Sequence, residues 1–286
     1  MKKKKVKWLI EKNIFETEDK MLQIIEELGM EYHLFSYVPI ACEIEKIPFS
    51  KNDCVVFYGS LNAAKVLQRK YSYLKPCVYG NFENYECSVY YPYYENFLLN
   101  RDRILLDYEF FKLNFDKLFQ LSFARNNALF VRPDSGLKPF TGKVFFKEQK
   151  NECFEEVELY GDLTPKSKIL VSSPKNIVGE WRFVITGNYL EDHIISGCQY
   201  RIDGKHEERN EYSDEAYRKL EQILKWVRFK PDLVWTADIC QTEDNDFHLL
   251  EIGCFSCSGL YSIDLEKVIQ EVSTISEAEF NKWRQT

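Results

Sequence analysis

Two carboxylates near the end of the chain have the type and spacing that would hold a divalent cation. Two β-rich runs within residues 234–253 flank a polar segment, which predicts a β-hairpin. If Asp244 and Asn245 form a two-residue turn, Asp238 lies directly opposite Glu251. Opposed carboxylates repel each other, so we expect a cation between them, and Mg²⁺ is the natural candidate because it prefers oxygen ligands. A solvated polar face, or another register, is the alternative interpretation.

Three cations lie upstream in a segment that is rich in small residues. Arg132, Lys138 and Lys143 stand there among glycine, serine and threonine. Small residues interleaved with cations suit a loop that closes over phosphate groups. The segment matches neither the P-loop nor the dinucleotide-binding fingerprint, so by itself it is a weak indication of a nucleotide site.

A third group of polar residues follows the apolar run 169–171. Ser172 and Ser173 end this run, and after a short loop the triplet Glu-Trp-Arg at 180–182 opens another predicted strand. Along the chain the order is therefore a cation, a cationic loop, a strand, a hinge, Glu-x-Arg, and finally an aspartate and a glutamate. This order is more informative than any one of its members.

The order resembles the ATP-grasp superfamily from about residue 100 to the end of the chain. More narrowly, four segments are similar to the arginine-for-lysine clade of bacterial and phage ATP-grasp proteins. They are Phe-Val-Arg-Pro at 130–133, Phe-Thr-Gly-Lys at 140–143, Val-Gly-Glu-Trp-Arg-Phe at 178–183 and Ser-Gly-Leu-Tyr at 258–261. The resemblance implies ATP and Mg²⁺ as cofactors. It also implies an α/β N-terminal domain followed by an α+β ATP-grasp domain, with nucleotide held between two antiparallel-sheet subdomains.

The resemblance implies nucleotide contacts for five residues. Arg132 stands where the superfamily has a lysine that contacts the nucleotide phosphates, and its fixed charge and forked donors suit the same role. Lys138 and Lys143 belong to the loop that closes over those phosphates. Ser172 and Ser173 lie at the hinge that contacts the adenine.

Five further residues are matched to the ribose, the reacting groups and the metal. Glu180 matches the carboxylate that accepts the ribose hydroxyls. Arg182 and Arg201 match catalytic cations near the transferred phosphate and the acyl group, and Arg201 is the looser match. Asp238 and Glu251 match magnesium ligands.

One position departs from the superfamily pattern. The final metal motif usually reads Glu-x-Asn, whereas here Glu251 is followed by Ile252 and Gly253. Three consequences are open. A water, Ser256 or another group replaces the missing ligand, or the second metal binds weakly, or the domain binds nucleotide without catalysis.

The elements that must position these residues divide the chain near residue 100. Residues 1–100 alternate β-rich runs, such as 32–38 and 54–58, with helical patterns, which predicts an α/β domain. Residues 101–286 contain further strands and a helix at 214–227, and antiparallel strands with a helix on one face are typical of an α+β domain.

Two aromatic-rich segments are expected to belong mainly to the core. The segment 101–121 has helical spacing, with Phe110, Phe111 and Phe115 expected to be buried. The tyrosine-rich segment 85–94 is expected to form core and rim, and the alternative is that it shapes the pocket for an acceptor substrate.

Composition excludes several classes of protein. A net charge of −7 argues against a nucleic-acid-binding surface, because phosphate backbones are bound by clustered Lys and Arg. No window approaches the roughly 18 consecutive apolar residues that a membrane span needs. Nine cysteines without a repeating spacing fit reduced thiols better than a disulfide framework. We therefore expect a soluble, cytoplasmic protein with no nucleic-acid or membrane partner.

Several functions remain open. The resemblance implies an ATP-dependent carboxylate–amine ligase that acts through an acyl phosphate, with small-molecule or peptide carboxylates and amines as substrates. A non-catalytic ATP-binding module and a phosphotransferase acting on a hydroxyl are the alternatives. Cys254 and Cys257 form a C-x-x-C pair, which with Cys240 or His248 is a weak candidate for a zinc site.

Overall fold

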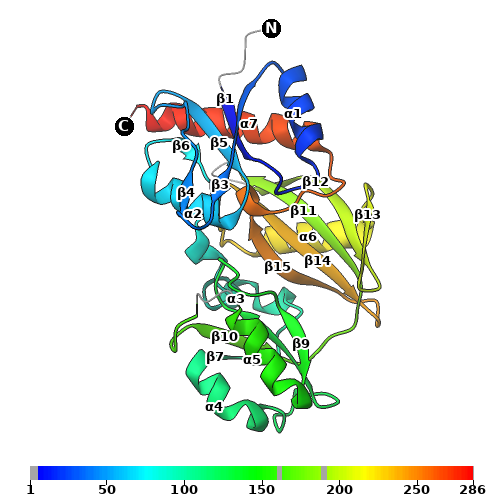
Figure 1. The fold of residues 1–286 in the computed structure, drawn as a ribbon. Helices are drawn as coiled ribbons and strands as arrows, with labels where there is room; N and C mark the ends of the chain where they lie inside the picture. The colour runs from blue at the N-terminus through cyan, green and yellow to red at the C-terminus, as the bar shows by residue number, and fades with distance from the viewer. Residues whose placement is uncertain (1–5, 160–162, 188–191, 286) are drawn as a thin grey trace.

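The computed structural model describes residues 6–159, 163–187 and 192–285 (Figure 1). The N-terminal elements are β1 (Val6–Glu11), α1 (Glu18–Glu27), β2 (Glu31–Phe35), β3 (Tyr37–Val38), β4 (Glu43–Ile44), β5 (Cys54–Tyr58), α2 (Leu61–Lys70) and β6 (Lys75–Cys77). Four of these strands form a parallel sheet in the order β2-β1-β5-β6, which confirms the predicted α/β domain. The strand expected at 32–38 ends at Phe35, because β3 pairs with β4 in a separate antiparallel ladder.

Short helices link this N-terminal sheet to the rest of the chain. They are η1 (Phe82–Tyr85), α3 (Cys87–Tyr94) and η2 (Glu95–Phe97). Tyr90, Tyr91 and Tyr94 of α3 are buried in a hydrophobic core together with Trp235, whereas Tyr93 is 59% exposed. The tyrosine-rich segment is therefore mainly core, as its composition predicts.

A small lobe of residues 103–172 follows. Its elements are β7 (Arg103–Asp107), α4 (Tyr108–Leu118), β8 (Ala128–Pro133), β9 (Lys143–Phe146), η3 (Lys147–Gln149), α5 (Lys150–Glu158) and β10 (Lys168–Ser172). The strands form an antiparallel sheet in the order β7-β10-β8-β9.

The helix expected at 101–121 is wrong in its first part, because residues 103–107 pair with β10 as an edge strand. Phe111 and Phe115 are buried as predicted, but Phe110 is 52% exposed, since it lies off the helix face that covers the sheet.

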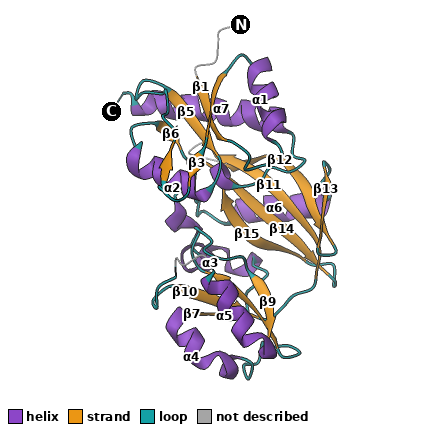
Figure 2. Ribbon diagram, viewed as in Figure 1, coloured by secondary structure: helices purple, strands orange, loops and turns teal. Residues whose placement is uncertain are grey.

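The third unit is an antiparallel sheet in the order β13-β12-β11-β14-β15, here called the large sheet. Its elements are β11 (Ile177–Gly187), β12 (Asp192–Ile202), β13 (Lys205–Arg209), α6 (Asp214–Trp226), β14 (Val234–Thr242) and β15 (Phe247–Cys254), followed by η4 (Phe255–Cys257). The α6 helix covers one face (Figure 2), where it packs on Trp235, Ala237 and Ile239. Because side chains alternate along a strand, Asp238 points to the opposite face.

The last helix, α7 (Leu265–Trp283), returns to the N-terminal sheet. Val268 and Val272 share a core with Val6 and Trp8, and the Trp8 Nε1–H donates to Ser273 Oγ at 3.2 Å. The division into 1–100 and 101–286 stays a prediction, but a unit that contains the N-terminal sheet needs α7 to complete its core. No helix in the described part of the chain is long and apolar enough to cross a membrane.

The loop between β8 and β9 is fixed to the N-terminal part of the chain at its first residues. The buried Asp134 carboxylate accepts hydrogen bonds from the Ser88 backbone N–H at 2.6 Å and from Ser88 Oγ at 2.7 Å. The Cys87 N–H donates to the Asp134 carbonyl at 2.9 Å. At Gly136 an added Cβ would lie 2.6 Å from the Phe82 carbonyl oxygen, so this approach requires glycine. These hydrogen bonds attach the small lobe to the start of α3.

Replacing Asp134 should weaken this attachment. In Asp134→Ala the Ser88 N–H and hydroxyl lose the buried carboxylate that accepts from them, which costs about 1.5–3 kcal/mol for a hydrogen bond to a charged group. We expect a lower midpoint in equilibrium urea unfolding. The control is Asp116→Ala, which removes an exposed carboxylate that pairs with Lys150 on the outer surface of the lobe. Equal midpoints for the two variants would contradict the assigned role of Asp134.

Candidate active site

The hairpin of β14 and β15 brings Asp238 opposite Glu251, as predicted, but its turn and strand register differ from those expected. Its loop contains three residues rather than two, because the Thr242 N–H donates to the Asp246 carbonyl at 3.0 Å. This loop alone would pair Asp238 with Leu250. A bulge between Asp238 and Ile239 adds one residue on β15 and restores the predicted pair.

A cavity of about 430 Å³ lies where the small lobe faces the large sheet. It is built by β8 and the following loop from one side, and by β11, β12, β14 and β15 from the other. The structure brings most of the predicted site residues to its wall. They are Arg132, Lys138, Glu180, Arg182, Arg201, Asp238 and Glu251.

Each of the two opposed carboxylates is paired with its own cations. Asp238 Oδ1 and Oδ2 accept from Arg182 Nε at 2.8 Å and Nη2 at 2.7 Å, and both side chains are buried. Glu251 Oε1 lies 2.8 Å from Lys138 Nζ, and Glu251 Oε2 lies 3.3 Å from Arg132 Nη2. The expectation that Asp238 and Glu251 repel each other in the metal-free protein is therefore wrong, because cations from neighbouring elements compensate both charges.

Glu251 is held in its ionised form by these neighbours. Burial alone would raise the pKa of Glu251, but the charges of Lys138 and Arg132 outweigh it and lower the pKa to about 2. The Glu251 carboxylate is consequently negatively charged at neutral pH.

Glu180 and Arg201 form a second group at the cavity wall. Tyr200 donates its hydroxyl to Glu180 Oε2 at 2.6 Å and lies 3.1 Å from Asp238 Oδ2, while Arg201 Nη1 lies 3.1 Å from Glu180 Oε1. Burial raises the pKa of Glu180 above its usual value, against the lowering effect of Tyr200 and Arg201. The group thus connects Glu180 to the Asp238 carboxylate through one hydroxyl.

Two tyrosines were missed by sequence reasoning. The rings of Tyr200 and Tyr261 stack with centroids 4.8 Å apart, and the Arg182 guanidinium lies about 5 Å from both centroids. Tyr200 directly precedes Arg201 in β12, and Tyr261 ends one of the four clade-like segments. Its place in that segment could have indicated Tyr261 as a site residue, whereas nothing in the sequence singled out Tyr200.

Three predicted residues are not brought to the cavity wall. Lys143 Nζ pairs with Glu156 Oε2 at 2.6 Å, and its side chain is 55% exposed. Ser172 and Ser173 are buried at the hinge, where their hydroxyls donate to Asn100 and Asp102. Contact of these three residues with a nucleotide stays a prediction.

Gly253 stands where the superfamily has an asparagine, and packing explains the difference. A Cβ added at Gly253 would lie 2.6 Å from Thr236 Oγ1 and 3.0 Å from Ser258 Oγ. These two hydroxyls lie 3.1 Å apart, and Ser258 lines the cavity. The hydroxyl of Ser256 instead accepts from the Tyr79 N–H, so it is part of the contact with the N-terminal sheet.

The residues present fit a magnesium ion only together with ligand oxygens from another molecule. Within residues 6–159, 163–187 and 192–285, no cluster of three or more His, Cys, Asp or Glu side chains is arranged to hold a metal. Asp238 and Glu251 are two carboxylates, which suits Mg²⁺ when phosphate oxygens complete the set. The zinc alternative gains no support, since Cys240 Sγ donates to the His248 carbonyl.

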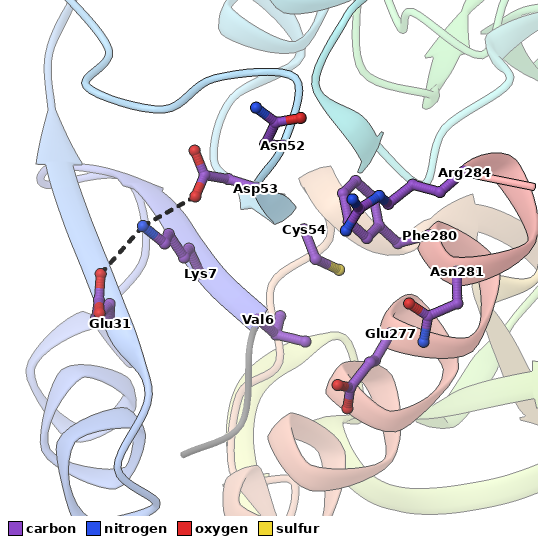
Figure 3. A pocket seen from close by; sticks show the side chains of 10 residues that line it. All are labelled: Val6, Lys7, Glu31, Asn52, Asp53, Cys54, Glu277, Phe280, Asn281 and Arg284. Carbon is purple, nitrogen blue, oxygen red and sulfur yellow. Dashed lines mark ion pairs between the residues drawn. The ribbon is translucent and has the colours of Figure 1, made fainter. Parts of the chain in front are cut away.

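A second hollow lies at the other end of the molecule, between β1, β5 and α7 (Figure 3). Its floor includes Val6 and Phe280, and Lys7 at its wall pairs with Glu31 at 3.2 Å and Asp53 at 3.0 Å. It opens at the amino ends of the parallel strands. Ligands of open α/β sheets bind at the carboxyl ends, so we do not take this hollow as the active site.

The comparison with protein families decides the assignment of the chain. A family model described as "ATP-grasp domain, R2K clade family 2" matches residues 112–271. The chain belongs to this family. The match confirms the resemblance to the ATP-grasp superfamily that the sequence indicated. The antiparallel sheets of the small lobe and the large sheet are consistent with an ATP-grasp domain. No curated protein sequence matches the chain.

Solved structures with the same fold include several ATP-grasp ligases. D-alanyl-alanine synthetase A from Vibrio cholerae O1 biovar eltor has a TM-score of 0.62 at 8% identity, covering 98% of this chain and 99% of that one. D-Alanine-D-alanine ligase from Helicobacter pylori has a TM-score of 0.59 at 12% identity, with coverages of 94% and 98%. The ATP-grasp ligase PsnB, complexed with a minimal precursor, has a TM-score of 0.53 at 12% identity, with coverages of 96% and 99%. At such identities the likeness shows the fold alone.

Replacing Asp238 tests the pairing of its carboxylate. Asp238→Asn leaves the buried Arg182 guanidinium without its bidentate partner, and breaking a buried ion pair in this way costs about 3–5 kcal/mol. We expect the nucleotide-free variant to unfold at a clearly lower urea concentration. Asp246→Asn, at the exposed tip of the same hairpin, is the control. An unchanged or raised midpoint for Asp238→Asn would mean that repulsion between Asp238 and Glu251 dominates after all.

Proposed function

We propose that this R2K-clade protein is an ATP-dependent carboxylate–amine ligase that acts through an acyl phosphate. The observation that carries the proposal is the division of charge across the cavity. Arg132 and Lys138 of the small lobe face the carboxylates of Asp238 and Glu251 on the large sheet. The two cations of the small lobe suit a triphosphate, and the carboxylates of the large sheet, which also carries Arg182 and Arg201, suit the metal that accompanies it.

The side chains of the cavity would act mainly by position and charge. Bound ATP with Mg²⁺ would supply the phosphoryl group and neutralise its charge. Arg132 and Lys138 would hold the phosphates, while Asp238 and Glu251 would hold the metal. Arg182 and Arg201 would stabilise negative charge near the transferred phosphate and the acyl group. No covalent intermediate on the protein is required, because the substrate carboxylate is itself the nucleophile.

We infer that the substrates are small molecules or a peptide. Among the solved structures with this fold, one is a D-alanyl-alanine synthetase and another, PsnB, is complexed with a precursor peptide. We place the reaction in the cytoplasm. All nine cysteines are free thiols, which fits a reducing compartment.

The proposal is tested by ADP and phosphate release with mixed candidate carboxylates and amines. A ligase should release both products only when a carboxylate and an amine are present together. A phosphotransferase should release ADP with a hydroxyl substrate and leave the phosphate on that substrate. Tight ATP binding without turnover on any mixture would favour the non-catalytic module.

Arg132 offers a direct test of the phosphate-binding wall. Arg132→Ala should weaken ATP binding by about 1.5–3 kcal/mol, the loss expected for a hydrogen bond to a charged group. Isothermal titration calorimetry with Mg-ATP measures the change, and circular dichroism checks that the variant is folded. Arg209→Ala, which removes an exposed guanidinium paired with Glu207 on β13, serves as the control. Unchanged affinity in Arg132→Ala would remove this residue from the phosphate site.

We propose that the Glu180 carboxylate accepts hydrogen bonds from the ribose hydroxyls of the nucleotide. Its carboxylate lines the cavity and is ordered by Tyr200 and Arg201. We expect 2′,3′-dideoxy-ATP to bind the unmodified protein at least about tenfold more weakly than ATP, the loss of one to two hydrogen bonds to a charged group. In Glu180→Gln the difference between the two nucleotides should shrink. Equal binding of both nucleotides to the unmodified protein would contradict a ribose contact by any group.

A further inference from the structure

All four carboxylate oxygens at the metal end of the cavity are already bonded to cations of the protein. Asp238 gives both oxygens to Arg182, and Glu251 gives one to Lys138 and one to Arg132. A cation that approached Glu251 in this state would meet the positive charges of Lys138 and Arg132 beside the two oxygens. The free protein is therefore a poor receptor for a divalent ion alone.

The two bonds to Glu251 differ in how easily they can be released. Arg132 is buried on a strand, with 9% of its side chain exposed. Lys138 stands in the loop between β8 and β9, with φ of 45° and 42% of its side chain exposed. A lysine ammonium on a flexible four-carbon stem can turn from one anionic partner to another at little cost. Lys138 is thus the contact that can change partner.

We propose that Lys138 is an internal counterion that closes the metal site until nucleotide arrives. Phosphate oxygens would draw the Lys138 ammonium away from Glu251 and would at the same time supply the oxygen ligands that the carboxylates lack. The divalent ion then binds with the nucleotide and not before it. This inference rests on the nucleotide binding proposed above, and it adds an order of assembly to that site.

The proposal has two opposite consequences for one residue. Lys138 favours binding of the phosphates, and it disfavours binding of the metal alone because it occupies Glu251 Oε1. Removing its charge should therefore strengthen metal binding in the absence of nucleotide and weaken nucleotide binding in the absence of metal. A purely structural role of Lys138 would move both affinities in the same direction or neither.

The test uses Lys138→Met, which keeps the length of the side chain and removes the charge. Mn²⁺ replaces Mg²⁺, and electron paramagnetic resonance of the free ion measures its binding without nucleotide. Calorimetry with the ATP analogue AMPPNP in EDTA measures nucleotide binding without metal. We expect Mn²⁺ to bind the variant about tenfold more tightly than the unmodified protein, and AMPPNP to bind it about tenfold more weakly.

The control is Lys150→Met, which removes an exposed ammonium of the same lobe that pairs with Asp116. It should leave both affinities unchanged. Equal Mn²⁺ affinities for the unmodified protein and Lys138→Met would overturn the counterion role, even if AMPPNP binds well. Failure of the unmodified protein to bind AMPPNP with or without Mn²⁺ would overturn the proposed function itself, so the two failures are distinguishable.

Discussion

Charge balance inside the cavity is the constraint on which the rest of the site depends. Burying an ionised carboxylate is costly unless a cation and hydrogen bonds compensate it. The fold meets this requirement twice, with Arg182 for Asp238 from the neighbouring strand and with Arg132 and Lys138 for Glu251 from the small lobe. Because the second pairing joins two separate sheets, the same contacts that neutralise the site also define how the lobe faces the large sheet.

Further contacts that hold the lobe in this position lie outside the cavity. The Asp134 carboxylate is bonded to Ser88 at the start of α3, and α3 is packed into the core that covers the large sheet. Arg132 lies near the end of β8, and Asp134 is the first residue after that strand. The start of the phosphate-facing loop is therefore fixed relative to the large sheet, while the Lys138 side chain farther along remains half exposed. A fixed base with one movable cation suits a site that has to exchange a carboxylate partner for phosphates.

The sequence predicts most of the site but not its internal pairing. Order along the chain and the resemblance to the ATP-grasp superfamily pointed to Arg132, Glu180, Asp238 and Glu251, and the structure brings all four to one cavity. The predicted pair of Asp238 and Glu251 was correct although the turn was wrong, since a three-residue loop and one bulge shift the register in opposite directions. Cation partners were not predictable, because they come from residues distant in the chain. The strand at 103–107 was missed for the same reason, as only pairing with β10 makes it a strand.

The glycine at position 253 shows how one departure from the superfamily pattern is tied to the packing around it. An asparagine has no room there while the hydroxyls of Thr236 and Ser258 occupy the space above the strand. The three positions form one packed unit, in which the glycine leaves room for a pair of hydroxyls. The Ser258 hydroxyl donates to the Cys254 carbonyl and keeps acceptor capacity on the side that lines the cavity. The hydroxyls of Thr236 and Ser258 therefore place oxygen atoms beside Gly253 at this corner of the site.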